Sequence, residues 1–376
     1  MNPIDYKQKR DDLVNGFLMS WDIRKDEMLA AKYHIVSASL SNYLPGIDCR
    51  AHGDIFKNIL LHQQLSHLEQ ASYGALQHMS CENLSGTTWG ILKNGPSIIC
   101  TFHTGSYRLI NLFLTRNKIS YSLVIANNVI KTQGDLFNDL YRGIMNSPGA
   151  NGLEIINAEH PSSGLQMLKN LKKGRSLLLY VDGNTGAGGG TMKNENHCRI
   201  NFLNQMLLAR KGIGFLAHAA NVPILPVACY RKSLEDIRLR FFEPICPNTS
   251  EAREVFAVRS TQAIYDLLAP IVQECPEQWE AWLYLHKSAH IINGYQKKGE
   301  PELGEGRKLV FNKSLYSVFS IAGRAFLFNR NSYLSYPIDN NLYALLSGCG
   351  MQGAKREDVD IALLQQLCNN HVLEVA

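Results

Sequence analysis

A histidine at the end of a short apolar run has the setting that best fits catalysis in this sequence. His103 closes the run 96–102 and is followed by Thr-Gly-Ser, after which a helix is expected to begin. A neutral imidazole with a pKa of about 6.5 can take a proton from a hydroxyl or an amine at neutral pH. The N–H groups of Gly105 and Ser106, at the start of a helix, are suited to receive an anion. The alternative is a turn histidine bonded to the backbone.

A second polar group closes a second apolar run. Asp182, Gly183 and Asn184 follow the run 176–181 and lead into a glycine-rich loop at 186–190. Loops after the carboxyl ends of strands meet at one rim of an α/β sheet, so we expect Asp182 and His103 at the same rim. The loop lacks a nucleotide-binding signature. We interpret it as a mobile flap over a substrate channel, with a surface turn as the alternative.

The elements that position these residues alternate in type along the chain. Apolar runs alternate with helical stretches, which predicts an α/β fold: a mixed sheet flanked by helices, with a helical N-terminal section and a small C-terminal winged-helix-like domain. The polar stretch 297–308 is interpreted as a linker. The expected boundaries are 1–94 for the N-terminal section, 95–296 for the α/β domain and 309–376 for the C-terminal domain. The expected strands of the sheet lie at 96–102, 120–126, 153–158, 176–181 and 223–230.

Composition restricts the classes of function. The chain has 376 residues, 45% hydrophobic and 19% charged, and a net charge of +5. This charge suits anionic lipid or an acidic carrier but is too small for nucleic-acid binding. Nine scattered cysteines without metal-ligand spacing favour free, buried thiols in a reducing cytosol. Without a secretory segment or a run of about 18 apolar residues, we expect a cytoplasmic protein, at most peripheral to the inner membrane.

Several sequence blocks resemble one family. They are the string TFHTGSYR at 101–108, LKNLKKGR at 168–175 followed by VDG at 181–183, INFL at 200–203, KGIGFLA at 211–217 with VPILPV at 222–227, and PEQW at 276–279 with Trp282. In this order they resemble the lipid A biosynthesis acyltransferases of the lysophospholipid acyltransferase superfamily. The resemblance spans about residues 95 to 287.

The resemblance implies an acyl transfer in which His103 is the general base. The co-substrate would be an acyl thioester, on an acyl carrier protein or coenzyme A, and no further cofactor is expected. The family places an aspartate or glutamate five residues after the histidine, where this chain has Arg108. A guanidinium cannot hold the imidazole N–H, and its charge lowers the pKa of a histidine. Either Asp182 orients His103, or the acceptor is an amine or thiol that needs less help, or the site is weakened.

Other candidate residues have weaker signals. Arg199 lies where the family often places a basic residue, so it is a candidate to hold the donor phosphate, or else a solvated charge. Gly183 and Asn184 are candidate substrate contacts beside Gly105 and Ser106. Trp279 and Trp282 are most simply core residues.

The C-terminal 65 residues resemble a second group of proteins. The order of two short strands and two helices loosely resembles the small PqqD-like peptide-binding domains, which implies a peptide or enzyme partner bound along a strand edge. A winged helix for dimer contact is the alternative.

Taken with the family resemblance, the sequence predicts an acyltransferase acting on a hydroxyl or amine of a soluble or peripheral acceptor, in specialised metabolite or peptide biosynthesis. The rival hypothesis is a degenerate acyltransferase fold that serves as a peptide- or partner-binding scaffold.

Overall fold

The structure, a computed structural model, describes residues 3–23, 26–145, 153–183, 195–248, 250–292, 309–348 and 360–375. The chain forms two compact units. The first comprises residues 1–20 and 57–289, and the second comprises residues 21–56 and 290–376. Within the described ranges, no helix combines the length and apolarity needed to cross a membrane. The linker expected at 297–308 lies outside the described residues.

A mixed sheet forms the centre of the first unit and confirms the α/β fold class. Seven of the described strands build it, in the order β1–β9–β8–β2–β5–β3–β4. Neighbouring strands run parallel except β8 and β9, which are antiparallel. The bounds are β1 Met79–Glu82, β2 Ile98–Thr101, β3 Tyr121–Ile125, β4 Glu154–Asn157, β5 Ser176–Tyr180, β8 Ile224–Ser233 and β9 Asp236–Phe241.

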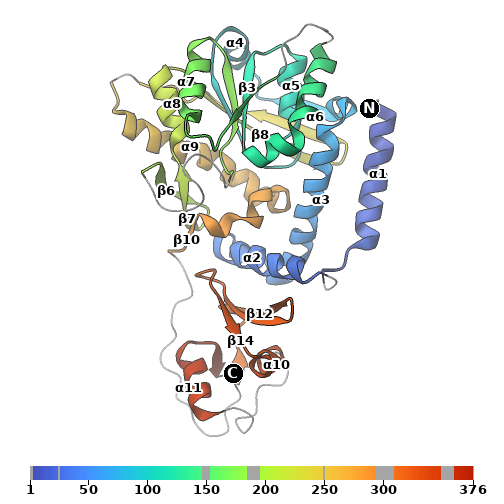
Figure 1. Cartoon of the computed structure of the whole chain (residues 1–376), viewed down its shortest axis with the longest axis vertical. Helices are drawn as coiled ribbons and strands as arrows, with labels where there is room; N and C mark the ends of the chain where they lie inside the picture. Colours follow the sequence, from blue (N-terminus) through green and yellow to red (C-terminus); the bar gives the residue numbers. More distant parts are fainter. Residues whose placement is uncertain are drawn as a thin grey trace. The chain divides into compact units, whose positions relative to one another are not determined.

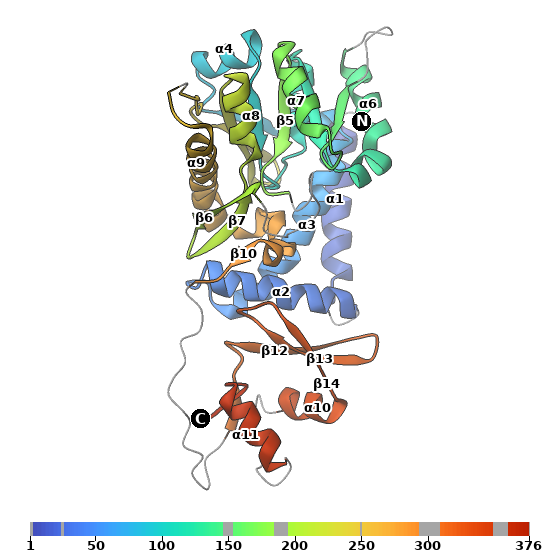
Figure 2. The same cartoon turned by 60° about the vertical axis from the view of Figure 1, so that its left-hand side comes forward.

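Helices cover both faces of this sheet. In Figure 1 and Figure 2, α8 and α9 lie on one side of the strands and α6 lies on the other. The side chains of β2 and β5 are buried almost throughout, as expected for central parallel strands. The helices of this unit are α1 Pro3–Ser20, α4 Gly86–Asn94, α5 Leu109–Arg116, α6 Asn127–Met145, α7 Ser163–Lys172, α8 Gly212–Ala220 and α9 Arg253–Glu274, with most of α3 His52–Gln70. A hairpin of β6 His197–Phe202 and β7 Gln205–Arg210 extends from the layers.

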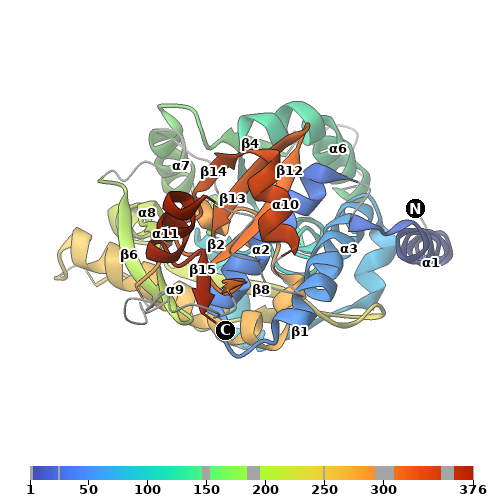
Figure 3. The same ribbon diagram turned by 90° about the horizontal axis from the view of Figure 1, so that it is seen from below.

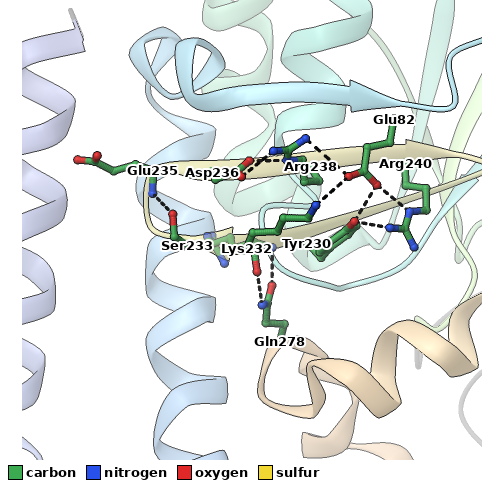
Figure 4. Close-up of polar contacts among 10 residues, drawn as sticks. Glu82, Tyr230, Lys232, Ser233, Glu235, Asp236, Arg238, Arg240 and Gln278 are labelled. Carbon is green, nitrogen blue, oxygen red and sulfur yellow. Dashed lines mark hydrogen bonds and ion pairs between the residues drawn. The ribbon is translucent and has the colours of Figure 1, made fainter.

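Charged side chains hold the edge strand β1 to its neighbours. Glu82 of β1 accepts a hydrogen bond from the Tyr230 hydroxyl at 2.7 Å and from Arg240 Nε at 2.8 Å. Figure 4 shows Lys232 and Arg238 reaching the same carboxylate, at 3.5 and 3.7 Å. One carboxylate therefore ties β1 to side chains of both β8 and β9. The sequence does not predict β1, because a run of four residues is too short for its alternation to mark a strand.

The second unit contains a small antiparallel sheet. Its strands are β12 Tyr316–Ile321, β13 Arg324–Asn329 and β14 Ser335–Ile338, in that order. Figure 3 shows these strands with α10 Asn340–Gly348, which contacts β12 and β13. The helix α11 Ile361–Asn369 follows, and β11 Leu309–Phe311 pairs with β15 Leu373–Val375. The expected short strands and two helices are present, together with the further strands β14 and β15, and the winged-helix-like and PqqD-like interpretations remain predictions.

The helices expected at 1–94 do form, but they do not make one section. The helix α2 Glu27–Tyr43 packs on the small sheet through Ala31 and Ala38, beside Phe319 and Phe328. A buried arginine of the second unit reinforces this contact, since Arg330 Nη2 donates to the Ser37 carbonyl at 3.0 Å. The amphipathic pattern of a helix does not say which core the helix covers. The boundary expected at residue 94 therefore differs from the division in the structure.

A close approach of two helices yields the first prediction. A Cβ atom on Gly214 of α8 would lie 2.5 Å from the Cα atom of Ala257 on α9, whereas one on Gly212 would meet nothing within 4 Å. Gly214→Ala is expected to lower the free energy of unfolding by about 1–3 kcal/mol, the usual cost of overpacking. Gly212→Ala, in the same helix, is expected to leave it unchanged or raise it by up to about 1 kcal/mol. Urea unfolding of both variants measures this, and equal stabilities would contradict it.

Candidate active site

The register of two parallel strands brings His103 and Asp182 together. Thr101 at the end of β2 lies opposite Tyr180 at the end of β5, and Val181 N donates to the Thr101 carbonyl at 2.9 Å. Each candidate residue follows its strand by two positions, so both reach the same level at the carboxyl rim of the sheet. The sequence expectation that they share one rim is confirmed.

Asp182 holds His103 through both its ring and its backbone. The His103 Nδ1 and Asp182 Oδ1 atoms are 2.7 Å apart, and the His103 backbone N–H donates to Asp182 Oδ2 at 3.0 Å. A carboxylate only accepts, so Nδ1 carries a proton, and in the neutral ring Nε2 keeps its lone pair. The Asp182 side chain is 2% exposed and the His103 side chain 19% exposed. Among the described residues, no hydrogen bond to His103 Nε2 is found.

The segment that follows α9 supplies the outer support of this pair. Trp279 Nε1 donates to Asp182 Oδ2 at 2.7 Å, and the backbone N–H of Glu280 donates to the His103 carbonyl at 2.8 Å. The Gln278 side chain accepts a hydrogen bond from the backbone N–H of Arg231 on β8 at 2.7 Å and donates one to the Arg231 carbonyl at 2.8 Å. Figure 4 shows Gln278 with these contacts as dashed lines. Trp279 is 1% exposed and is thus a core residue, as expected, but it also fixes the carboxylate.

The turn after His103 explains the glycine at 105. Gly105 has φ +51°, and its backbone N–H donates to the Gln278 carbonyl at 2.9 Å. A Cβ atom there would lie 2.8 Å from the Cα atom of Tyr230, so the position needs glycine for both conformation and space. Ser106 is fully buried, and its backbone N–H bonds the Cys229 thiol. Both amides are occupied, and the structure corrects the expectation that Gly105 and Ser106 receive an anion.

Three tyrosines surround the imidazole. The Tyr180 ring stacks on His103 with centroids 4.8 Å apart, and the Tyr107 ring meets it edge-on at the same distance. Tyr284 lies edge-on at 6.4 Å. The rings leave His103 one orientation, which serves a base that must meet a small acceptor atom.

Arg108 takes no part in orienting His103. It lies directly before α5, where its Nη1 donates to Gln70 and, at 3.0 Å, to Gln133, while Nη2 is 3.3 Å from His67 Nε2. Its guanidinium carbon lies 5.0 Å from the centroid of the Tyr107 ring. The first of the three alternatives, in which Asp182 takes the place of the missing acid, agrees with this geometry.

Glu280 is a residue of the site that the sequence analysis missed. Its Oε2 accepts from the Tyr107 hydroxyl at 3.1 Å, and its Oε1 accepts from Gln63 Nε2 at 2.8 Å. Glu280 directly follows Trp279 in the last block of the family resemblance, but nothing local marks it as a site residue. Its position arises from a non-local contact, the bridge between Thr104 and Trp279.

A cavity of about 640 Å³ opens beside His103, at the carboxyl ends of β3 and β5. Its wall carries both polar and apolar side chains, and His103, Tyr107, Arg108 and Glu280 are among the polar ones. Much of the remaining wall is apolar and comes from β3, α6 and α8: Val124, Ile125, Val129, Phe137, Phe215 and Leu216. A cavity of this size and lining suits a small molecule with a hydrocarbon portion.

Only some of the other predicted site residues line this cavity. Gly183 lines the cavity, whereas Asn184 and the glycine-rich loop at 186–190 lie outside the described residues. Arg199 is exposed on β6 and does not line the cavity. Arg210, at the end of β7, does line it, and burial lowers the pKa of this guanidinium.

The eight cysteines of the described ranges are free, but Cys49, Cys81 and Cys246 are exposed, which corrects the expectation of buried thiols.

Opposing effects act on the protonation of His103. Burial disfavours the charged ring, but the charge and hydrogen bond of Asp182 outweigh burial and raise the pKa of His103 above its ordinary value. Glu280 adds to this rise, and Arg108 opposes it. The imidazolium formed on taking a proton is therefore stabilised next to the cavity.

Comparison with known proteins gives a distant structural likeness. No protein-family model matches the chain, and no curated protein is similar to it. Among solved structures, it is similar to the 1-acyl-sn-glycerophosphate (LPA) acyltransferase PlsC from Thermotoga maritima, with 16% sequence identity and a TM-score of 0.31. The match covers 66% of this chain and 98% of that chain.

The Asp182 contact predicts a shift in a titration. Asp182→Asn keeps a hydrogen-bond acceptor but removes the negative charge, so the pKa of His103 is expected to fall from its raised value. Titration of the His103 ring protons by NMR measures this. Asp266→Asn, an exposed position on α9, is the matched control and is expected to leave the pKa unchanged. Equal His103 titrations in all three proteins would contradict the assignment.

Removal of the Arg108 charge is expected to act in the opposite direction. Arg108→Gln removes the cation that opposes protonation, so the pKa of His103 is expected to rise. The same NMR titration reads it out, with Arg116→Gln, an exposed arginine at the far end of α5, as the control. The control is expected to leave the pKa of His103 unchanged. A pKa of His103 that falls or stays unchanged in Arg108→Gln would show that Arg108 does not act on the ring.

Proposed function

We propose that the protein is an acyltransferase. It moves an acyl group from a thioester donor, an acyl carrier protein or coenzyme A, to a hydroxyl or amine of a soluble or peripheral acceptor. The observation that carries this proposal is the His103–Asp182 pair, with Nδ1 and Oδ1 2.7 Å apart, beside a cavity of about 640 Å³. A base held in one orientation next to an apolar space suits transfer of an aliphatic acyl group.

The chemistry of the step follows from the state of the ring. His103 Nε2 takes the proton of the acceptor as the acceptor atom attacks the thioester carbonyl carbon. The tetrahedral intermediate then expels the thiolate, which receives the proton from the imidazolium. Asp182 holds the ring through Nδ1–H and stabilises the imidazolium, the role that an aspartate has in a Ser-His-Asp triad.

The cavity wall suggests where each partner lies. The apolar side chains from β3, α6 and α8 suit the acyl chain, because burial of each methylene contributes about 0.8 kcal/mol. For a donor phosphate, Arg210 is better placed than Arg199, since Arg210 lines the cavity and Arg199 does not. We propose Arg210 for the role that the sequence analysis gave to Arg199.

An acyl-transfer assay tests the proposal. Purified protein is incubated with dodecanoyl coenzyme A and with dodecanoyl-acyl carrier protein, each with a mixture of hydroxyl and amine acceptors. His103→Ala is expected to lower the transfer rate by about 10²- to 10⁴-fold, the usual contribution of a general base. His160→Ala, an exposed loop histidine outside the cavity wall, is the control and is expected to keep the rate. Equal rates in His103→Ala and wild type would refute the catalytic role.

A second candidate function rests on the second unit. The strand β14 lies at the edge of its sheet, and Tyr336 and the neighbouring Leu334 are 46% and 55% exposed. An exposed strand edge with apolar side chains is suited to pairing with an extended peptide. A partner-binding scaffold is therefore the alternative, and absence of acyl transfer in both wild type and His103→Ala would favour it.

A further inference from the structure

Two opposite charges in the cavity wall have no ionic partner among the described residues. Arg108 contacts the amide oxygens of Gln70 and Gln133 and the ring of His67. Burial and the Arg108 charge both lower the pKa of His67, which favours the neutral form of that ring. Arg108 Nε is buried without any hydrogen-bond partner there. The cation is thus surrounded by neutral groups.

The anion has a similar environment. Glu280 accepts hydrogen bonds from the Tyr107 hydroxyl and the Gln63 amide, which are both neutral. No ion pair of Glu280 is found in the described part of the chain. A carboxylate in a partly buried wall is costly unless a cation compensates it, and the same holds for a guanidinium without an anion.

Tyr107 brings both charges to the base. The Arg108 guanidinium lies 5.0 Å from the centre of its ring, its hydroxyl is 3.1 Å from Glu280, and its edge faces His103 at 4.8 Å. A cation, an anion and a general base therefore surround one side chain. A ligand that carries an ammonium and a carboxylate a few ångströms apart would compensate both charges beside His103.

We propose that the acceptor is an amine that also bears a carboxylate, an amino acid, with its carboxylate on Arg108 and its ammonium near Glu280. This inference rests on the acyl transfer proposed above and specifies its acceptor. A neutral polyol, by contrast, would leave both charges without a partner. Arg108 then has a function at the position where the acyltransferase family has an acid.

The reaction balances with the groups present and the thioester. The ammonium loses one proton to His103 Nε2, and the free amine attacks the thioester carbonyl carbon. The C–N bond forms, the C–S bond breaks, and the nitrogen loses its second proton. One of the two protons goes to the thiolate and the other to solvent. The products are an N-acyl amino acid and a thiol.

The experiment compares matched acceptors. Wild-type protein and dodecanoyl coenzyme A are incubated with a mixture of the proteinogenic L-amino acids, with their methyl esters, or with glycerol, and products are quantified by mass spectrometry. The methyl esters keep the amine and lose the carboxylate charge. We expect N-dodecanoyl amino acids, with a preference for the free acids over the esters of about 10-fold or more, as for loss of a charged hydrogen bond. An equal or better yield from the esters or from glycerol would overturn the inference.

Variants assign the preference to residues. Arg108→Gln is expected to abolish the preference for free acids over esters, and Glu280→Gln to lower acylation of both by about 10-fold. Arg116→Gln and Glu274→Gln, which change exposed charges away from the cavity wall, are expected to change neither. Arg108→Lys keeps the charge and is expected to retain part of the preference. If it does so while Arg108→Gln is misfolded, the inference still stands, and an unchanged preference in folded Arg108→Gln would overturn it.

A binding measurement separates this inference from the proposed function. His103→Ala is titrated with the same amino acids and esters, without donor, by saturation-transfer NMR. Binding of the free acids in preference to the esters supports the charge recognition even where no transfer occurs. Transfer to glycerol with no binding of amino acids overturns the inference and leaves the acyltransferase proposal intact. Absence of both transfer and binding overturns the two together.

Discussion

The site depends on one buried carboxylate. Asp182 receives the ring and the backbone N–H of His103 and the indole N–H of Trp279, and its side chain is 2% exposed. These bonds join the ends of β2 and β5 to the segment after α9, three parts of the chain that are distant in sequence. A buried carboxylate without such donors would cost several kcal/mol, so loss of any of these hydrogen bonds is unfavourable. The orientation of His103 follows from that constraint.

Arg108 and Glu280 act in opposite senses on the protonation of His103. Because Asp182 holds Nδ1 from the adjacent strand, the position five residues after His103 need not carry an acid. It instead carries a cation held by glutamine side chains against Tyr107, which opposes protonation of His103. Glu280, which accepts a hydrogen bond from the Tyr107 hydroxyl, acts in the opposite sense and favours protonation of His103. The base is therefore influenced by two opposite charges, and a ligand that neutralises either one would change its protonation.

Local signals were enough to predict the centre of the sheet. The apolar runs that became β2 and β5 are continuous and end directly before His103 and Asp182, so the rim rule placed both residues together. The contacts of Glu280 and Trp279 were beyond local reasoning, because they depend on a bridge between residues 104 and 279. The amides of Gly105 and Ser106 were misjudged for the same reason, since their partners Gln278 and Cys229 lie far along the chain. Arg199 and Arg210 sit on paired strands of one hairpin, and sequence alone does not say which of them faces the cavity.

The protonation state of one ring tests the central claim most directly. Imidazole ¹⁵N NMR of His103, recorded in the wild-type protein above the pKa of this ring, distinguishes the two neutral tautomers. The structure predicts a proton on Nδ1, bound to Asp182, and a lone pair on Nε2 beside the cavity. A ring protonated on Nε2 would contradict it, because His103 would then have no lone pair available to an acceptor and Asp182 would not be holding a base.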